Sequence, residues 1–241
     1  MKQTLSLIVI IAMVMALGCT KETTAGTDGT QGIVKGRVTD SRGNGMPGVQ
    51  VVIEHTVLYA KYVYATTDAH GYYKTSVPEG SWRASVQIQK QFLDRTYNFE
   101  LCPDVADAFA GSAGAVRNFT WKLSGAKPYG GYYGSYVAVY NEPGYALEMS
   151  DVEIKLTPDG PLVDGSMGSV ISSKLSDIGG GEDGIRDVPI GMYVITAKNT
   201  ATGQPLEIRM RNTGTYGSSV TGIFNSGFTG LNNYQIVVQV K

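Results

Sequence analysis

The sequence predicts an all-β protein that contains two β-sandwich domains in tandem. Segments in which apolar and polar residues alternate recur along the chain, for example at residues 34–38, 82–88 and 234–240. This period of two is typical of strands with one buried face. Glycine (31 residues) and tyrosine (15 residues) are abundant, while charged residues make up only 17% of the chain. Many turns joined by β-favouring residues give such a composition.

Length and composition narrow the classes of function. A chain of 241 residues is long enough for one or two domains that bury a core without cross-links. Its formal net charge is −1, so the basic patch that a nucleic-acid-binding protein needs is not expected. With two cysteines and two histidines, neither a disulfide framework nor a histidine-based zinc site can be built. We therefore expect no nucleic-acid partner and no zinc centre.

Residues 1–18 have the features of a signal peptide. Lys2 precedes 13 mostly apolar residues, 5–17, which are too few for a membrane span of about 20 residues. The motif Ala-Leu-Gly-Cys that follows, at residues 16–19, resembles a bacterial lipobox. The resemblance implies cleavage before Cys19 and lipidation of that residue, and several acyl chains anchor a protein stably in a membrane. An ordinary secretory signal is the alternative, because a small residue before the cleavage site also suits a general signal peptidase.

Residues 19–31 are expected to form the lipidated cysteine and a flexible tether. From residue 20 the segment is rich in threonine and glycine and has no apolar periodicity. Lys21 and Glu22 resemble the export signals of Bacteroidetes-type lipoproteins. This resemblance implies a protein held by lipid in the outer membrane, on its periplasmic or its outer side, with outer-membrane proteins as candidate partners.

Residues 32–124 are expected to form the first sandwich. Strand patterns lie at residues 33–39 and 49–53, and the segment between them is rich in glycine, asparagine and proline, the residues of tight turns. Trp82 begins a further alternation of apolar and polar residues. This pattern places Trp82 in the core, and a surface platform for a ligand is the alternative.

Three motifs in this half resemble the carboxypeptidase regulatory-like domain, a small transthyretin-like β-sandwich. They are the opening strand, the segment at residues 66–73, and Val-Pro-Glu-Gly-Ser-Trp at residues 77–82, with tryptophan where the family usually has tyrosine. The resemblance covers roughly the first half of the mature chain. It implies that Asp68 caps a turn, that Gly71 takes the left-handed conformation, and that Tyr73 enters the core.

The same resemblance argues against catalysis. In the carboxypeptidases that give the family its name, the zinc ligands and the catalytic glutamate lie in a separate domain. This chain has neither a His-x-x-Glu motif nor room for that domain. Asp68 and His70 as metal ligands are the alternative to a structural turn, but two residues do not complete a site. We therefore expect a protein that is not an enzyme.

Residues 125–241 are expected to form a second sandwich. The boundary lies in the Gly-rich segment 124–131. The pattern Val-Pro-x-Gly-x-aromatic that ends at Trp82 returns with Tyr193 as its last residue. Such an internal echo predicts the same local hairpin in both halves and a second sandwich of related topology. Trp82 and Tyr193 then become equivalent core aromatics.

No cofactor is expected, with calcium as the one alternative. Two Gly-rich loops, at residues 157–166 and 178–187, carry carboxylates that together offer oxygen ligands to this ion. No EF-hand spacing is present, and acidic residues in such loops are usually just solvated. The five carboxylates are Asp159, Asp164, Glu182, Asp183 and Asp187.

Tyrosines near the domain boundary are the candidate ligand site. Tyr129, Tyr132 and Tyr133 lie in a Gly-rich segment and are expected to be exposed, whereas Tyr136 and Tyr140 share one face of a strand and are expected in the core. A sugar ring stacks its C–H face on an aromatic ring, and its hydroxyls hydrogen-bond to phenols. Glycine lets an extended ligand approach the backbone closely. The plain alternative is that tyrosine serves only as a good strand residue.

The sequence thus predicts a non-catalytic envelope lipoprotein that binds carbohydrate as an accessory protein of polysaccharide capture. The implied fold is similar to starch-binding sandwiches, and Tyr129, Tyr132 and Tyr133 would hold the glycan. The alternative is a structural or assembly role, as a pilin-like subunit or a spacer. A row of exposed aromatic residues favours the first function, and an open strand edge favours the second.

Overall fold

The computed structural model describes residues 31–227 and 234–241. Its regular structure is almost entirely β, and the 3-10 helix Met149–Asp151 is the one short exception among the described residues. The expected signal peptide, Cys19 and the tether up to residue 30 lie outside the described residues. Within the described ranges, no helix combines the length and apolar character needed to cross a membrane.

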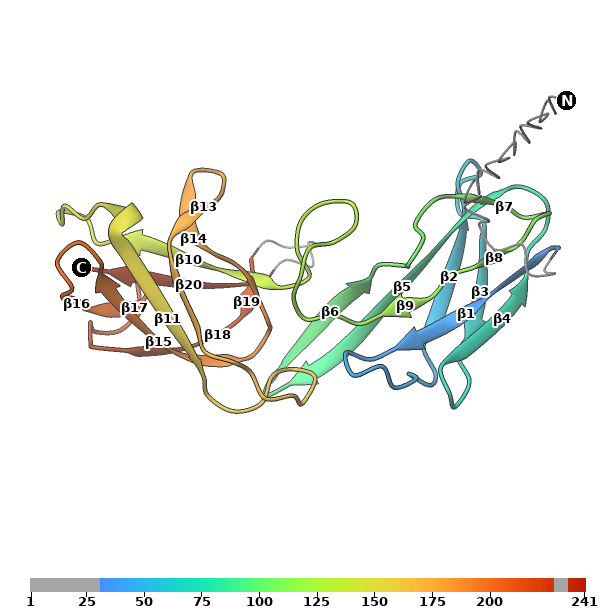
Figure 1. The fold of residues 1–241 in the computed structure, drawn as a ribbon. Helices are drawn as coiled ribbons and strands as arrows, with labels where there is room; N and C mark the ends of the chain where they lie inside the picture. The colour runs from blue at the N-terminus through green and yellow to red at the C-terminus, as the bar shows by residue number, and fades with distance from the viewer. Residues whose placement is uncertain (1–30, 228–233) are drawn as a thin grey trace, which may run out of the picture.

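Two sheets form the first lobe, which lies to the right in Figure 1. In one sheet β2 lies between β3 and β5, and β5 also pairs with β6 and β7. In the other, β1 is antiparallel to β4 and parallel to β8 and β9. The strands are β1 Ile33–Thr39, β2 Gln50–His55, β3 Tyr62–Thr66, β4 Tyr72–Ser76, β5 Ser81–Phe92, β6 Arg95–Leu101, β7 Phe109–Ala110, β8 Ala115–Val116 and β9 Phe119–Thr120.

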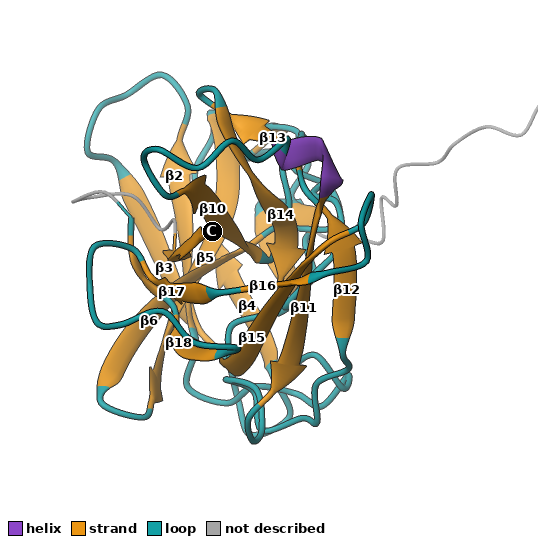
Figure 2. Ribbon diagram, turned by 90° about the vertical axis from the view of Figure 1, so that its left-hand side faces the viewer, coloured by secondary structure: helices purple, strands orange, loops and turns teal. Residues whose placement is uncertain are grey.

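Two further sheets form the second lobe, to the left in Figure 1. One has the order β13-β14-β10-β20-β17, with β19 also on β20, and the other has β12-β11-β15-β16, with β18 also on β15. Figure 2 shows this lobe from its outer end, where the short 3-10 helix lies at the edge. The strands are β10 Ser135–Asn141, β11 Val152–Pro158, β12 Ile171–Lys174, β13 Ser176–Gly179, β14 Glu182–Val188, β15 Met192–Asn199, β16 Pro205–Leu206, β17 Ile208–Met210, β18 Val220–Ile223, β19 Asn225–Ser226 and β20 Tyr234–Val240.

The two lobes share one strand topology. The first strand of each lobe, β1 or β10, is antiparallel to one neighbour (β4 or β14) and parallel to the last strands (β8 and β9, or β20). The second strand, β2 or β11, lies antiparallel between its hairpin partner (β3 or β12) and the long strand β5 or β15. The fold is therefore a tandem of β-sandwiches, as the sequence predicts, and the segment 121–134 links the two sets of sheets.

The Val-Pro-x-Gly-x-aromatic motif builds the same core contact in both lobes. The Nε1–H of Trp82 donates to the carbonyl of Pro78 at 2.9 Å, and the hydroxyl of Tyr193 donates to the carbonyl of Pro189 at 2.9 Å. Both rings are almost completely buried. Burial raises the pKa of Tyr193 to about 12. The prediction that Trp82 and Tyr193 are equivalent core aromatics is confirmed.

The turn before β4 has the structure that the family resemblance implies. Asp68 Oδ1 accepts hydrogen bonds from the backbone N–H groups of His70 at 2.8 Å and Tyr72 at 2.9 Å, and these bonds hold the pKa of Asp68 below its ordinary value. Gly71 has a φ of +81°, and a Cβ there would lie 2.4 Å from the Val38 carbonyl oxygen. Tyr73 is buried, and its hydroxyl donates to the carbonyl of Arg117 at 2.7 Å.

The hairpin of β5 and β6 reaches from the first lobe into the second (Figure 1). Arg95 Nη1 and the hydroxyl of Tyr97 both donate to the carbonyl of Phe224, at 2.8 and 2.7 Å. The ring of Tyr97 meets the ring of Tyr234 edge to face, 4.9 Å between centroids. The hairpin tip is therefore part of the packing of both lobes.

Candidate functional site

A cleft beside the domain boundary contains part of the expected tyrosine site. We call it the tyrosine cleft. It has a volume of about 560 Å³, and Tyr132, Tyr136, Lys127, Arg186 and Asp187 line it together with glycine backbone. Tyr132 comes from the Gly-rich segment before β10, Tyr136 from β10 itself, and the last two residues from β14. Segments about 50 residues apart in the chain thus meet at this cleft.

Asp187 fixes the Gly-rich segment that forms the cleft wall. Its carboxylate accepts the backbone N–H of Gly125 at 2.8 and 2.9 Å and that of Gly134 at 3.0 Å. A Cβ at Gly134 would lie 2.5 Å from the carbonyl carbon of Asp187, so a glycine is required for this close approach. Asp187 itself has a φ of +60°. One carboxylate therefore holds both ends of the segment 125–134 against β14.

The structure places the three expected site tyrosines in different surroundings. Tyr132 is 44% exposed and lines the cleft. Tyr129 is 66% exposed, and its hydroxyl accepts the backbone N–H of Ala106 in the first lobe at 3.1 Å. Tyr133 was expected to be exposed, but it is half-buried and lies beside Lys122, whose Nζ is 5.4 Å from the ring centroid. Burial and then contact with Cys102 raise the pKa of Tyr133 to about 12. Of the three, only Tyr132 lines the cleft.

Tyr136 and Tyr140 were expected in the core, and this expectation is wrong. Val137 and Val139 are buried on one face of β10, and on the other face Ala138 is buried between the half-buried Tyr136 and Tyr140. Tyr136 lines the tyrosine cleft. Burial and then the nearby Glu182 carboxylate raise the pKa of Tyr136 above its ordinary value.

Two charged groups of the cleft, Arg186 and Asp187, form hydrogen bonds with the protein backbone. Arg186 Nη2 donates to the backbone carbonyl of Asp177 at 2.6 Å, which fixes its guanidinium at the rim. Among the residues that the structure describes, no three His, Cys, Asp or Glu side chains are grouped as metal ligands. Asp187, one of the five acids considered for calcium, accepts N–H groups of the protein, as described above. The arrangement can stack an apolar ring face and bind hydroxyl groups.

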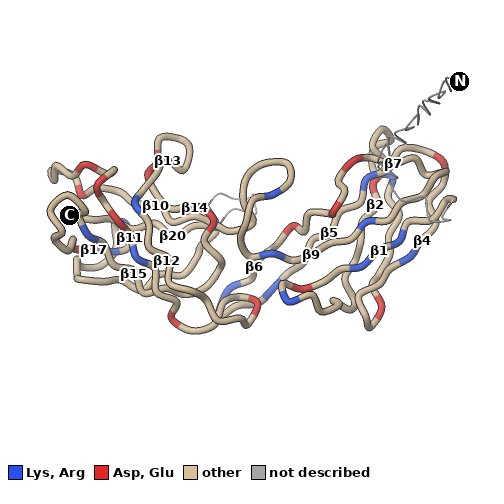
Figure 3. The backbone as a smooth tube through the Cα atoms, viewed as in Figure 1, with Lys and Arg blue, Asp and Glu red and all other residues tan. Residues whose placement is uncertain are grey.

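Basic and acidic residues are interspersed over both lobes (Figure 3). The ion pairs are mostly exposed, for example Lys174 with Asp151 at 3.4 Å and Lys198 with Glu153 at 3.0 Å. Exposed pairs of this kind contribute little stability. The charge distribution therefore does not by itself select a ligand.

Comparison with protein-family models gives a match within the first lobe. Residues 33–103 match the family model of the carboxypeptidase regulatory-like domain, which confirms the resemblance for this segment. No curated protein sequence matches the chain.

Solved structures show only distant similarity. The Bacillus anthracis TIE protein is 13% identical with a TM-score of 0.33, over 88% of this chain and 34% of that one, so the chain spans about a third of its length. The major pilin subunit BcpA of Bacillus cereus is 7% identical with a TM-score of 0.26, over 88% of this chain and 100% of that one. A DUF3823 family protein from Bacteroides ovatus is 9% identical with a TM-score of 0.23, over 79% and 97%.

Proposed function

We propose that this protein is a non-catalytic lipoprotein of the outer membrane that captures carbohydrate in the tyrosine cleft. The observation that carries this proposal is the cleft itself, where Tyr132 and Tyr136 lie beside Lys127, Arg186 and an ordered glycine backbone. Aromatic rings offer a face to the C–H surface of a sugar, and phenol, ammonium and guanidinium groups bind its hydroxyls. Ordered backbone on one wall reduces the entropy lost on binding.

Titration of the soluble chain from Thr20 onward against plant and host polysaccharides tests this function. We expect saturable binding in calorimetry. Tyr132→Ala should lower the affinity at least about tenfold, because it removes a ring that stacks on the sugar; tenfold corresponds to roughly 1.4 kcal/mol of binding free energy. Tyr145→Ala is the matched control, since Tyr145 is an exposed tyrosine of the second lobe outside the cleft. Equal binding by both variants, or no glycan binding at all, contradicts the proposal.

The anchor is tested separately from the ligand. The lipobox resemblance supports Cys19 as the lipidated residue, and we expect labelled palmitate to enter the whole chain but not Cys19→Ala. Fractionation should then place the parent chain in the outer membrane and release the variant. Equal labelling of both proteins contradicts a lipid anchor at this residue.

An assembly role is the second candidate function. It draws support from a strand edge that the first lobe leaves unpaired at the junction of the lobes, a feature on which the next subsection is based. The two functions use different surfaces, because the residues of this edge do not line the tyrosine cleft.

A further inference from the structure

The C-terminal part of β5, residues 87–92, lacks a neighbouring strand on one side. β5 pairs with β6 along residues 86–92, whereas its pairing with β2 ends at Val86, which lies opposite Val51. β7 pairs only with Ser81 and Trp82. In an antiparallel pair, every second residue directs its N–H and C=O away from the partner. Among the described strands, none forms hydrogen bonds with the N–H and C=O groups that residues 87–92 direct away from β6. This stretch is therefore an open sheet edge.

A groove runs along this open edge. We call it the junction groove. It has a volume of about 620 Å³ and lies between residues 87–90 of β5, the loop at residues 40–50, Trp121, and Val163 with Asp164 of the second lobe. Met46 and Ile88 give it apolar surface, and the amides of Gln87 and Gln89 give it polar surface. An extended chain fits such a setting, because alternate side chains of a strand meet apolar and polar walls in turn.

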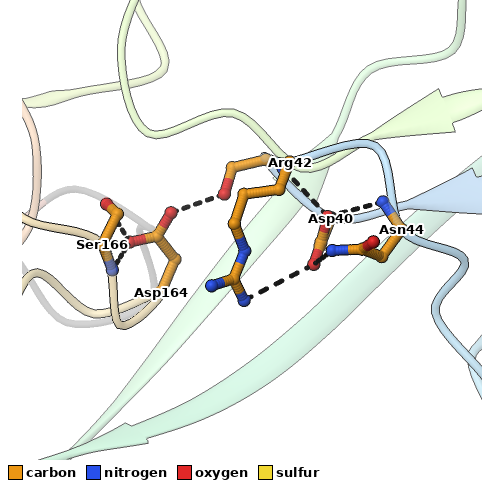
Figure 4. A network of polar contacts seen from close by, with 6 residues as sticks. Asp40, Arg42, Asn44, Asp164 and Ser166 are labelled. Atoms are coloured by element: carbon orange, nitrogen blue, oxygen red, sulfur yellow. Dashed lines mark hydrogen bonds and ion pairs between the residues drawn. The ribbon is translucent and has the colours of Figure 1, made fainter.

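The acidic groups of the groove are already bonded within the protein (Figure 4). Asp40 accepts the N–H groups of Arg42 at 2.9 Å and Asn44 at 2.8 Å, and also the Asn44 side-chain amide at 3.0 Å. Asp164 accepts the hydroxyls of Ser41, at 2.5 Å across the junction, and of Ser166, at 2.6 Å. Both carboxylates thus hold loops in place.

Two residues that line the groove, Trp121 and Lys90, carry donor groups without acceptors among the described residues. Trp121 is 4% exposed, and its Nε1–H has no hydrogen-bond partner among the described residues. A buried donor in this state costs free energy until an acceptor reaches it. Lys90 places its Nζ 5.1 Å from the centre of the Trp121 ring and forms no ion pair within the described part of the chain. The groove therefore lacks an anionic, hydrogen-bond-accepting partner.

We propose that the junction groove binds an extended peptide that pairs as an added strand with residues 87–91 of β5 and directs an acidic side chain toward Lys90 and Trp121. Backbone hydrogen bonds to an open edge give such a peptide affinity, and the pockets for its alternate side chains give specificity. A carboxylate is the group that satisfies both a lysine ammonium and an indole N–H. A sugar cannot continue the sheet, so a peptide uses the edge as well as the donors.

An array of nine-residue peptides tests the proposal, with the soluble chain from Thr20 onward. Apolar and polar positions alternate in the peptides, and the central polar residue is Glu, Gln or Lys. We expect the best Glu peptides to bind at least fivefold more tightly than their Gln and Lys versions. Methylation of alternate backbone nitrogens on the pairing side should abolish binding, and hydrogen exchange should show new protection within residues 87–91.

Two variants and a matched control locate the site. Lys90→Gln should remove the preference for Glu, and Trp121→Phe should weaken the Glu peptides severalfold while it keeps an aromatic ring in the core. Lys198→Gln, on the equivalent long strand β15, should bind like the parent. Glycan binding that depends on Tyr132 is unaffected by these changes, so the two proposals fail separately.

Three results overturn the proposal. They are the absence of saturable binding by any peptide at millimolar concentration, equal binding of N-methylated peptides, and protection of residues 87–91 by oligosaccharide instead of peptide. The last result would assign the groove to a glycan.

Discussion

The two lobes repeat one topology, and they differ most in the strand that follows the Val-Pro-x-Gly motif. β5 has 12 residues and β15 has 8. β15 lies opposite β11 along residues 193–199 and carries β18 and β16 on its other side. β5 is paired with β2 only up to Val86, and from there to Phe92 its one partner among the described strands is β6. The extra length produces two features at once, a hairpin that packs against the second lobe and an open edge beside it.

The largest expected effect tests whether the aromatic residue of the repeated motif contributes equally to the stability of both lobes. Trp82→Ala and Tyr193→Ala should each lower the free energy of unfolding by about 3–5 kcal/mol, because each truncation leaves a cavity in a packed core. Urea denaturation followed by circular dichroism measures both. Tyr72→Ala, a change at an exposed tyrosine of β4, is the control and should stay close to the parent. A large loss in one lobe and none in the other would break the equivalence.

The turns before β4 and β14 should respond unequally to the same substitution. Gly71 and Gly180 both have positive φ, at +81° and +69°, but only at Gly71 would a Cβ collide with backbone, at 2.4 Å from Val38. An alanine in the left-handed conformation costs about 1–2 kcal/mol. We expect Gly180→Ala to lose that amount and Gly71→Ala to lose clearly more, in thermal unfolding. Equal losses would show that the tight contact of Gly71 is absent in solution.

Loss of single hydroxyls gives smaller effects. Tyr97→Phe removes the bond to Phe224 across the junction, and Tyr193→Phe removes the bond to Pro189 within the second lobe. Each should lower stability by about 1 kcal/mol. If Tyr97→Phe has no effect while Tyr193→Phe does, the hydrogen bond from Tyr97 to Phe224 contributes nothing to stability.

The raised pKa of Tyr193 has an effect only at alkaline pH. Burial raises the pKa of Tyr193 to about 12 in the folded protein, above the ordinary value of about 10. The unfolded chain therefore loses this proton first as pH rises. The stability linked to Tyr193 is complete below about pH 10 and is lost as the pH rises toward about 12. Tyr193→Phe should show a shallower decline across this window in urea titrations, and an unchanged slope would contradict the burial.

The sequence was sufficient for features built from neighbouring residues. The alternation around Trp82, the turn at Asp68 and Gly71, and the return of the motif at Tyr193 are local patterns with direct physical causes. They led to the tandem β-sandwich fold and to the core position of both motif aromatics. The same local reasoning correctly expected exposure for Tyr129 and Tyr132.

Features that depend on distant partners could not be predicted. Tyr97 bonds to Phe224, 127 residues away, and Asp187 reaches back to Gly125 and Gly134. No periodicity marks such pairs. Tyr136 was assigned to the wrong face, because a run of apolar residues from 137 to 139 hides which face of β10 is buried. The junction groove was missed for the same reason, since residues from both lobes form it.

Residue-resolved amide hydrogen exchange tests the central claim most directly, because it compares the two long strands in one experiment. In the unliganded protein, we predict strong protection at residues 193–195 of β15, which have neighbours on both sides. Within residues 87–91 of β5, alternate amides should exchange orders of magnitude faster, because their N–H groups face the open edge. Uniform strong protection along β5 would contradict the account, since the edge would then be paired and the junction groove would have no strand to offer.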